Sequence, residues 1–224
     1  MRDAGRAKQC RSIFVLFVIV LISMFVFGCM QQTPQVGEGR GEEMVASGKR
    51  VLMVIAPTNF RDEEYLEPRS VLEKAGVNVT VASKGTRTAT GMFGANVVVD
   101  IDIADANVSE YDAVVFVGGA GSAVYFNDST ALSMAKESFA QGKITAAICI
   151  APSILANAGV LKDKNATSWP SEQQNIEANG GHYTGDPVTQ DGKIITGNGP
   201  MAATQFGKKV VEALSGTPST SSSG

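Results

Sequence analysis

The chain has 224 residues, of which 44% are apolar, which is enough for one large domain or two small ones. Only 18% of the residues are charged and the net charge is -3, so we expect no nucleic-acid-binding surface. One histidine and three widely spaced cysteines, Cys10, Cys29 and Cys149, exclude a zinc finger and argue against other metal sites and a disulfide scaffold.

The first 29 residues have the layout of an export signal. Basic residues dominate positions 1–12, and an apolar run at 13–28 follows that is shorter than the ~20 residues needed to span a bilayer. The run ends at Gly28-Cys29, which resembles the lipobox of prokaryotic lipoproteins, where the cysteine is lipidated. The alternative is an uncleaved anchor helix from Ile13 to about Met30. Either way, we expect the rest of the chain to lie outside the cytoplasm, attached to the membrane.

The composition divides the remainder into three parts. Residues 30–48 are polar, glycine-rich and aperiodic, which is typical of a flexible linker, and the serine-rich residues 215–224 indicate a disordered tail. We therefore expect one folded domain at 49–214.

Within this domain, apolar runs alternate with patterns of helical period, which favours an α/β fold with a mainly parallel sheet. We expect strands at 51–56, 77–82, 97–101, 113–117, 144–148 and 193–196. We expect helices at 62–75, 129–141, 152–158 and 201–214. Ser129 is placed to cap the second of these helices, which Gly142 would end.

Cys149 stands where a predicted strand turns into a helix. The apolar strand 144–148 runs directly into it, and Pro152 falls in the first turn of the next helix, where proline is tolerated. Such a corner lies at the carboxyl edge of the sheet, where open α/β sheets bind ligands. A helix N-terminus would also lower the pKa of the thiol. The alternative is an inert buried cysteine, and the corner alone leaves both interpretations open.

Five segments of the domain form a recognisable series. They are RDEEYLEP at 61–68, the glycine pair 118–119, AICIAP at 147–152, AGVL at 158–161 with ATSWP at 166–170, and GGHY at 180–183 with DGKIIT at 191–196. In this order they resemble the DJ-1/PfpI (ThiJ) superfamily over about residues 50–214. The resemblance implies a single-domain, flavodoxin-like α/β sandwich with a mainly parallel sheet, helices on both faces and a nucleophile-elbow cysteine. It also implies a homodimer or larger assembly, and no cofactor is indicated.

The resemblance also implies roles for particular residues. Cys149 takes the place of the reactive cysteine, and Glu64 that of an acid in contact with its sulfur. A carboxyl group buried beside a thiolate would stay protonated, donate a hydrogen bond to the sulfur and then transfer a proton. The backbone N–H groups of Gly119 and Ile150 would form an oxyanion-type pocket. Taken without the resemblance, Glu64 is better explained as a solvated acid in the first turn of a helix.

Two features of this sequence depart from the family pattern. Many members have a histidine directly after the cysteine, where this chain has Ile150, and others have one at the position of Trp169. The single histidine, His182, falls in the late GGHY segment and is better explained as a surface or structural residue. Cysteine peptidases generally need a histidine base, so peptidase activity is doubtful. We expect Gly118 and Trp169 to line the pocket.

These residues leave three functions open. The resemblance implies glyoxalase- or deglycase-like chemistry on small reactive carbonyls, in stress protection, by Cys149 and Glu64. The alternative is a thiol oxidant sensor without turnover, in which Cys149 is oxidised to the sulfenic or sulfinic acid. The third is a binding module that has lost catalysis.

Overall fold

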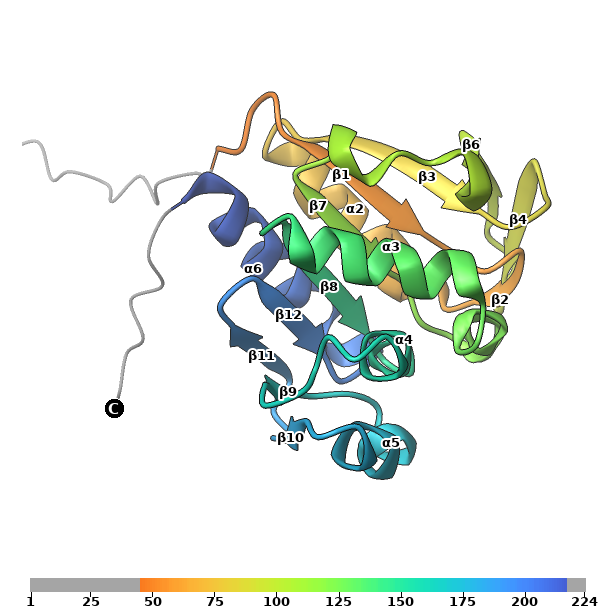
Figure 1. Cartoon of the computed structure of the whole chain (residues 1–224). Helices are drawn as coiled ribbons and strands as arrows, with labels where there is room; N and C mark the ends of the chain where they lie inside the picture. The colour runs from red at the N-terminus through yellow and green to blue at the C-terminus, as the bar shows by residue number, and fades with distance from the viewer. Residues whose placement is uncertain (1–44, 217–224) are drawn as a thin grey trace, which may run out of the picture. The chain divides into compact units, whose positions relative to one another are not determined.

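The computed structural model of the chain describes residues 45–216 (Figure 1). These residues belong to one compact unit. Cys29, the export segment and nearly all of the linker lie outside the described residues, as does the tail after residue 216. Among the helices at 45–216, none has the length and apolar character needed to cross a membrane.

A seven-stranded sheet forms the centre of the described region, with the strand order β11-β12-β8-β7-β1-β3-β6. Its strands are β1 (Arg50–Val54), β3 (Asn78–Ser83), β6 (Ile101–Asp102), β7 (Ala113–Phe116), β8 (Ile144–Ile148), β11 (Val188–Asp191) and β12 (Ile194–Gly197). Every pairing is parallel except that of β11 with β12. Strands β7 and β8 are buried along their whole length, as their continuous apolar sequences predict.

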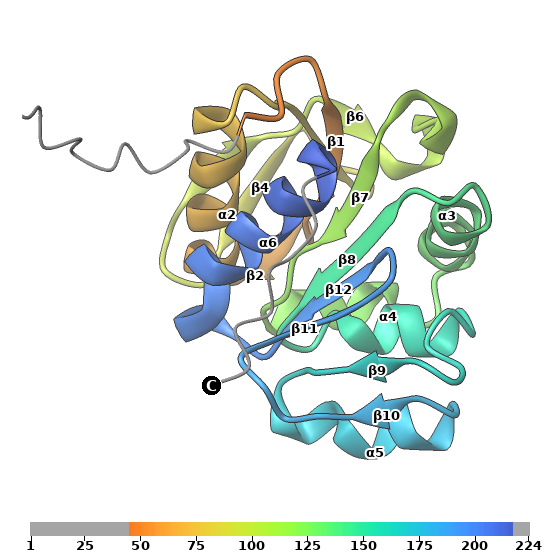
Figure 2. The ribbon, with the colours of Figure 1, turned by 90° about the vertical axis from the view of Figure 1, so that its left-hand side faces the viewer.

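Helices cover both faces of this sheet, which confirms the predicted α/β fold (Figure 2). Helices α2 (Asp62–Lys74) and α6 (Ala203–Ser215) pack on one face, and α3 (Ser129–Ala140) and α4 (Pro152–Asn157) on the other. The two helices of the first face approach closely because Gly207 lacks a side chain: a Cβ there would lie 2.8 Å from the Pro68 Cα.

Shorter elements extend the two ends of the fold and were not predicted. Strands β2 (Thr58–Phe60), β4 (Thr88–Gly91) and β5 (Asn96–Val98) form a three-stranded sheet, whereas β9 (Asn165–Ala166) and β10 (His182–Tyr183) form a two-stranded sheet beside α5 (Gln173–Ala178). The strand expected at 97–101 is therefore wrong, since its residues are divided between β5 and β6 in different sheets. Short 3-10 helices occur at Ile103–Asp105, Val108–Glu110, Ala120–Tyr125, Pro170–Glu172 and Pro200–Ala202.

Two local expectations need correction. Helix α3 is capped by Asp128 and not by Ser129: the Asp128 carboxylate accepts a hydrogen bond from the Ala131 N–H at 3.0 Å. The packed region also begins earlier than residue 49, because Ala46 is buried and its N–H donates to the Ala75 carbonyl at 2.8 Å.

Candidate active site

Cys149 follows β8 directly and has a strained backbone. Its φ is 65°, in the left-handed region that costs a non-glycine residue on the order of 1 kcal/mol. Two hydrogen bonds hold it there: its N–H donates to the Gly197 carbonyl at 2.9 Å, and its carbonyl accepts from the Trp169 N–H at 2.7 Å. The sharp turn thus fixes the direction of the thiol at the carboxyl edge of the sheet.

This edge is also where the connections of the sheet diverge. The chain passes from β1 to β3 on one side and returns to β7 and β8 on the other side of β1. Ligands of open α/β folds bind at such switch points. Three segments distant in sequence meet here: the first turn of α2 with Glu64, the turn after β7 with Gly118, and the Cys149 corner.

Gly118 allows Glu64 and Cys149 to approach each other. A Cβ at position 118 would lie 2.5 Å from the Cys149 Cβ and 2.5 Å from the Glu64 Oε2. Contacts this short do not occur for real side chains, so any larger residue would displace the cysteine, the glutamate or both. The absence of a side chain at Gly118 is therefore a condition for the Cys149–Glu64 pair.

The next residue, Gly119, also has no room for a side chain, but because of a different contact. Its φ is 94°, and a Cβ there would lie 2.2 Å from the Arg61 nitrogen. That Arg61 N–H donates to the Gly118 carbonyl at 3.0 Å, which joins the start of α2 to the turn after β7. The N–H groups of Gly119 and Ile150 lie close enough to the Cys149 sulfur to lower the pKa of its thiol. The structure thus brings together Cys149, Glu64 and both residues expected to supply the oxyanion-type pocket.

Glu64 is completely buried, so the alternative of a solvated helix acid is wrong. Neither carboxyl oxygen has a well-formed hydrogen-bond partner. Burial raises the pKa of Glu64 to about 7, because the carboxylate loses its hydration. The Cys149 thiol, the Arg61 guanidinium and the Gly118 N–H oppose this rise without cancelling it.

The Cys149 thiol is 9% exposed, and its pKa is also raised. Burial is the main cause and the neighbouring Glu64 is the second; together they raise the pKa to about 12, against the N–H groups of Gly119 and Ile150. The predicted lowering by the helix N-terminus is therefore wrong, since α4 has only six residues and does not offset the burial. Consequently Glu64 ionises first, at a pH of about 7, and above that pH the pair keeps one proton, on the Cys149 sulfur.

A pocket of about 520 Å³ opens over this pair. Of the two residues expected to line it, Trp169, with 47% of its surface exposed, forms part of the wall, whereas Gly118 lies behind Glu64 and Cys149 and is not a lining residue. The lining residues that the sequence did not identify come from five separate loops and helix ends: Arg61, Met92, Ala120, Ala123, Phe126, Ser171, Glu172 and Pro200. Of these, only Arg61 lies in one of the recognisable segments. His182 lies on β10 and does not line the pocket.

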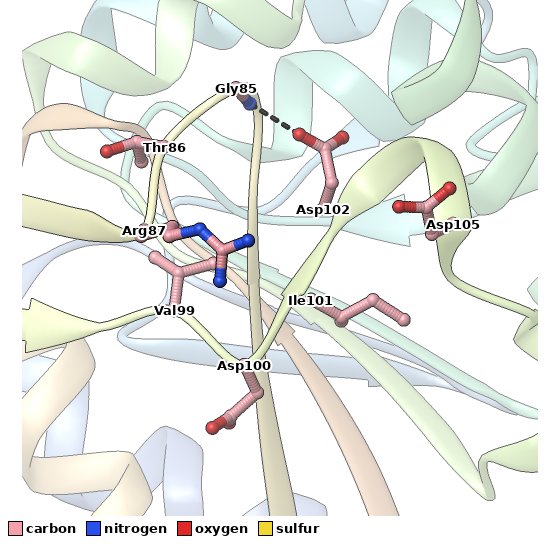
Figure 3. Close-up of a pocket in the computed structure, with 8 residues that line it drawn as sticks. All are labelled: Gly85, Thr86, Arg87, Val99, Asp100, Ile101, Asp102 and Asp105. Carbon is pink, nitrogen blue, oxygen red and sulfur yellow. Dashed lines mark hydrogen bonds between the residues drawn. The ribbon is translucent and has the colours of Figure 1, made fainter.

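A second pocket, of about 410 Å³, lies near β6 and is acidic (Figure 3). Two of its three carboxylates are used within the fold: Asp102 accepts from the N–H groups of Gly85 and Ala104 at 2.6 and 2.9 Å, and Asp100 accepts from the Val81 N–H at 2.8 Å. Its one hydroxyl, that of Thr86, donates to the Thr88 carbonyl at 2.7 Å, and no cysteine or histidine is among the residues that line it. The pocket at Cys149 is therefore the better candidate for chemistry.

Known proteins are similar in sequence and in fold to most of this domain. A sequence model with the description "DJ-1/PfpI family" matches residues 49–213. An uncharacterised protein of Methanocaldococcus jannaschii is 40% identical over 74% of this chain and 82% of its own length. A deglycase of Pyrococcus horikoshii is 32% identical over 73% and 98%, respectively. The crystal structure of a ThiJ/PfpI domain protein from Brachyspira murdochii superposes with a TM-score of 0.74 at 32% identity, covering 76% of this chain and all of that one.

Proposed function

This chain belongs to the DJ-1/PfpI family, and on that basis we propose that it converts 2-oxoaldehydes to 2-hydroxy acids with Cys149 and Glu64. One observation carries the proposal: a completely buried carboxyl group without a good hydrogen-bond partner lies against the thiol of a strained nucleophile turn. Perturbed acids placed in this way are typical of catalytic sites. The name of the Pyrococcus relative, a deglycase, agrees with carbonyl chemistry.

In the first step, Glu64 acts as the base for the thiol. With a pKa of about 7 it is largely ionised at slightly alkaline pH, and it takes the proton of Cys149 as the sulfur attacks the aldehyde carbon. The C–S bond forms and the carbonyl electron pair moves to oxygen, beside the N–H groups of Gly119 and Ile150. Return of the proton to this oxygen gives a hemithioacetal and regenerates the carboxylate.

In the second step, Glu64 moves the hydrogen of the former aldehyde carbon to the neighbouring ketone carbon as a proton. The hydroxyl proton passes from the first oxygen to the second, and the product is a thioester of the 2-hydroxy acid. Water then cleaves the C–S bond and releases the acid and the free thiol. The first carbon is oxidised and the second is reduced, so the reaction consumes one water and no external oxidant.

The measurement is lactate formation from methylglyoxal by the purified domain. We expect steady turnover by the wild-type chain, none by Cys149→Ser, and a rate about 100-fold lower for Glu64→Gln, the usual effect of losing a general acid–base group. Glu137→Gln, an exposed acid on α3, is the matched control and should retain the full rate. Lactate formation that persists in Cys149→Ser would exclude this function.

Oxidation of Cys149 without turnover is the second candidate. It is favoured by the N–H groups of Gly119 and Ile150, which lie close to the sulfur and would bind the oxygens of a sulfinate. Cys149 is also the single cysteine of residues 45–216, so that region supplies no second thiol to form a disulfide. Treatment with hydrogen peroxide followed by mass spectrometry should then find two added oxygen atoms on Cys149, and an unmodified thiol would rule this candidate out.

We also propose that the protein is held at a membrane, through lipid on Cys29 or through residues 13–30, as the sequence predicts. The described chain begins at the end of the sheet where β1 starts, whereas Cys149 lies at the opposite edge, after β8. The pocket therefore lies at the end of the sheet opposite to residue 45, where the described chain begins. Labelling of cells with a palmitate analogue should mark the wild-type chain and not Cys29→Ala, and equal labelling of the two would contradict lipidation.

A further inference from the structure

Five of the exposed apolar side chains of the described region belong to the segments that line the Cys149 pocket. Nine large apolar residues are exposed at 45–216: Val45, Leu66, Met92, Phe93, Val98, Val124, Phe139, Trp169 and Met201. Met92 and Trp169 line the pocket, and Phe93, Val124 and Met201 each follow a lining residue in sequence. We call these five residues the apolar rim. Met201 is 98% and Phe93 65% exposed, and exposed apolar side chains that occur together beside a pocket are typical of a binding surface.

Apart from Glu64, the charged groups of the pocket wall, Arg61 and Glu172, are already paired within the protein. The Arg61 guanidinium donates to the Glu63 carboxylate at 2.9 and 3.3 Å and lies over the Phe93 ring at 4.5 Å. The two oxygens of Glu172 accept from Ser153 at 2.5 Å and from Ser171 at 2.7 Å. A charged substrate would therefore have to compete with these contacts, whereas a neutral one would not.

Trp169 is held in one position on this wall. Its N–H donates to the Cys149 carbonyl, its carbonyl accepts from Glu172 at 2.9 Å, and its ring lies so close to Gly199 that a Cβ there would be 2.9 Å from the Cε3. A backbone hydrogen bond thus joins Trp169 directly to Cys149, and nearly half of the surface of Trp169 remains exposed. A preset aromatic face of this kind binds flat apolar groups at little entropic cost.

We propose that the preferred substrates are neutral 2-oxoaldehydes whose ketone carbon carries an aromatic or long alkyl group, which binds against Trp169 and the apolar rim. This substrate class rests on the function proposed above and narrows it. A pocket of about 520 Å³ has the size of sites that enclose drug-sized ligands, so a three-carbon dicarbonyl would leave most of it unfilled. The aldehyde carbon would bind beside the Cys149 sulfur, and the apolar group would displace water from the apolar rim.

The test compares phenylglyoxal with methylglyoxal, by the mandelate and lactate formed. In the wild-type chain we expect kcat/KM to be about 10-fold higher for phenylglyoxal, the effect of one good aromatic contact. In Trp169→Ala this ratio should fall to about one. Phe139→Ala removes an exposed aromatic residue on α3, away from the pocket, and should leave both rates unchanged.

A second readout does not depend on turnover. Trp169 is the single tryptophan of the chain, so its fluorescence reports on this wall alone. In Cys149→Ser, benzyl alcohol should change the emission in a saturable way and ethanol should not. If neither dicarbonyl is converted but benzyl alcohol still binds, the proposed reaction is wrong and the apolar specificity stands; if benzyl alcohol does not bind either, both are wrong.

Two results would overturn the substrate class while leaving the reaction intact. One is conversion of methylglyoxal at least as efficiently as phenylglyoxal by the wild-type chain. The other is a preference for phenylglyoxal that Trp169→Ala does not reduce. If, in addition, sedimentation shows that Trp169→Ala dissociates an oligomer, the apolar rim is a contact between copies of the chain and not a substrate wall.

Discussion

The buried Glu64 should make the stability of the protein fall as the pH rises from about 4.5 to about 7. Its pKa increases from 4.5 to about 7 on folding, and each pKa unit corresponds to about 1.4 kcal/mol, so the effect is on the order of 3 kcal/mol. Because the folded-state pKa is the higher one, this stability is fully present below pH 4.5. It is lost as the pH rises to about 7, where the folded protein also ionises.

The assay is urea unfolding of the wild-type chain and of Glu64→Gln between pH 4 and 8. The amide is neutral throughout, so the variant should gain on the order of 3 kcal/mol relative to the wild type from the low to the high end of this range. Subtracting the free energies of unfolding of the two proteins removes the contributions of the other titrating groups. Glu137→Gln provides the control for loss of an exposed acid. A wild-type-minus-variant difference that does not change with pH, or that changes in the opposite direction, would refute the reasoning.

Two further substitutions test separate parts of the structure. Gly118→Ala should destabilise the domain by about 1–3 kcal/mol, because the new Cβ would lie 2.5 Å from both Cys149 and Glu64. Displacement of these two residues should also lower the rate of lactate formation by about 100-fold. An unchanged rate would contradict the steric role of Gly118. Asp128→Ala should cost about 1 kcal/mol through loss of the α3 cap, whereas Ser129→Ala should cost little; thermal unfolding that shows the reverse order would restore Ser129 as the cap.

The central sheet and its helices could be predicted because their sequences carry strong local signals. The strand 144–148 is apolar at nearly every position and buried at every position, and its end at Cys149 coincides with the corner in the structure. The smaller sheets could not be predicted in this way. Strand β4, with the sequence TATG, and the two residues of β9 are too short to show a period, and only their partners in space define them.

The site was only partly accessible from sequence. Cys149, Glu64, Gly119 and Ile150 do come together, but the resemblance to a family, and not the residue pattern, singled out Glu64. The helix argument gave the wrong direction for the pKa of Cys149, because it considered the short helix α4 and not the burial beside a second acid. The steric role of Gly118 depends on two contacts to distant segments, which come together only in the folded chain.

The central claim is that Glu64 serves as the base for Cys149. The most direct test is the rate at which iodoacetamide alkylates Cys149 between pH 5 and 10, followed by mass spectrometry of the peptide that contains it. We predict that the wild-type rate rises with an apparent pKa of about 7, that of Glu64, and that in Glu64→Gln the rise moves to clearly higher pH. Identical pH profiles for the two proteins would contradict the claim.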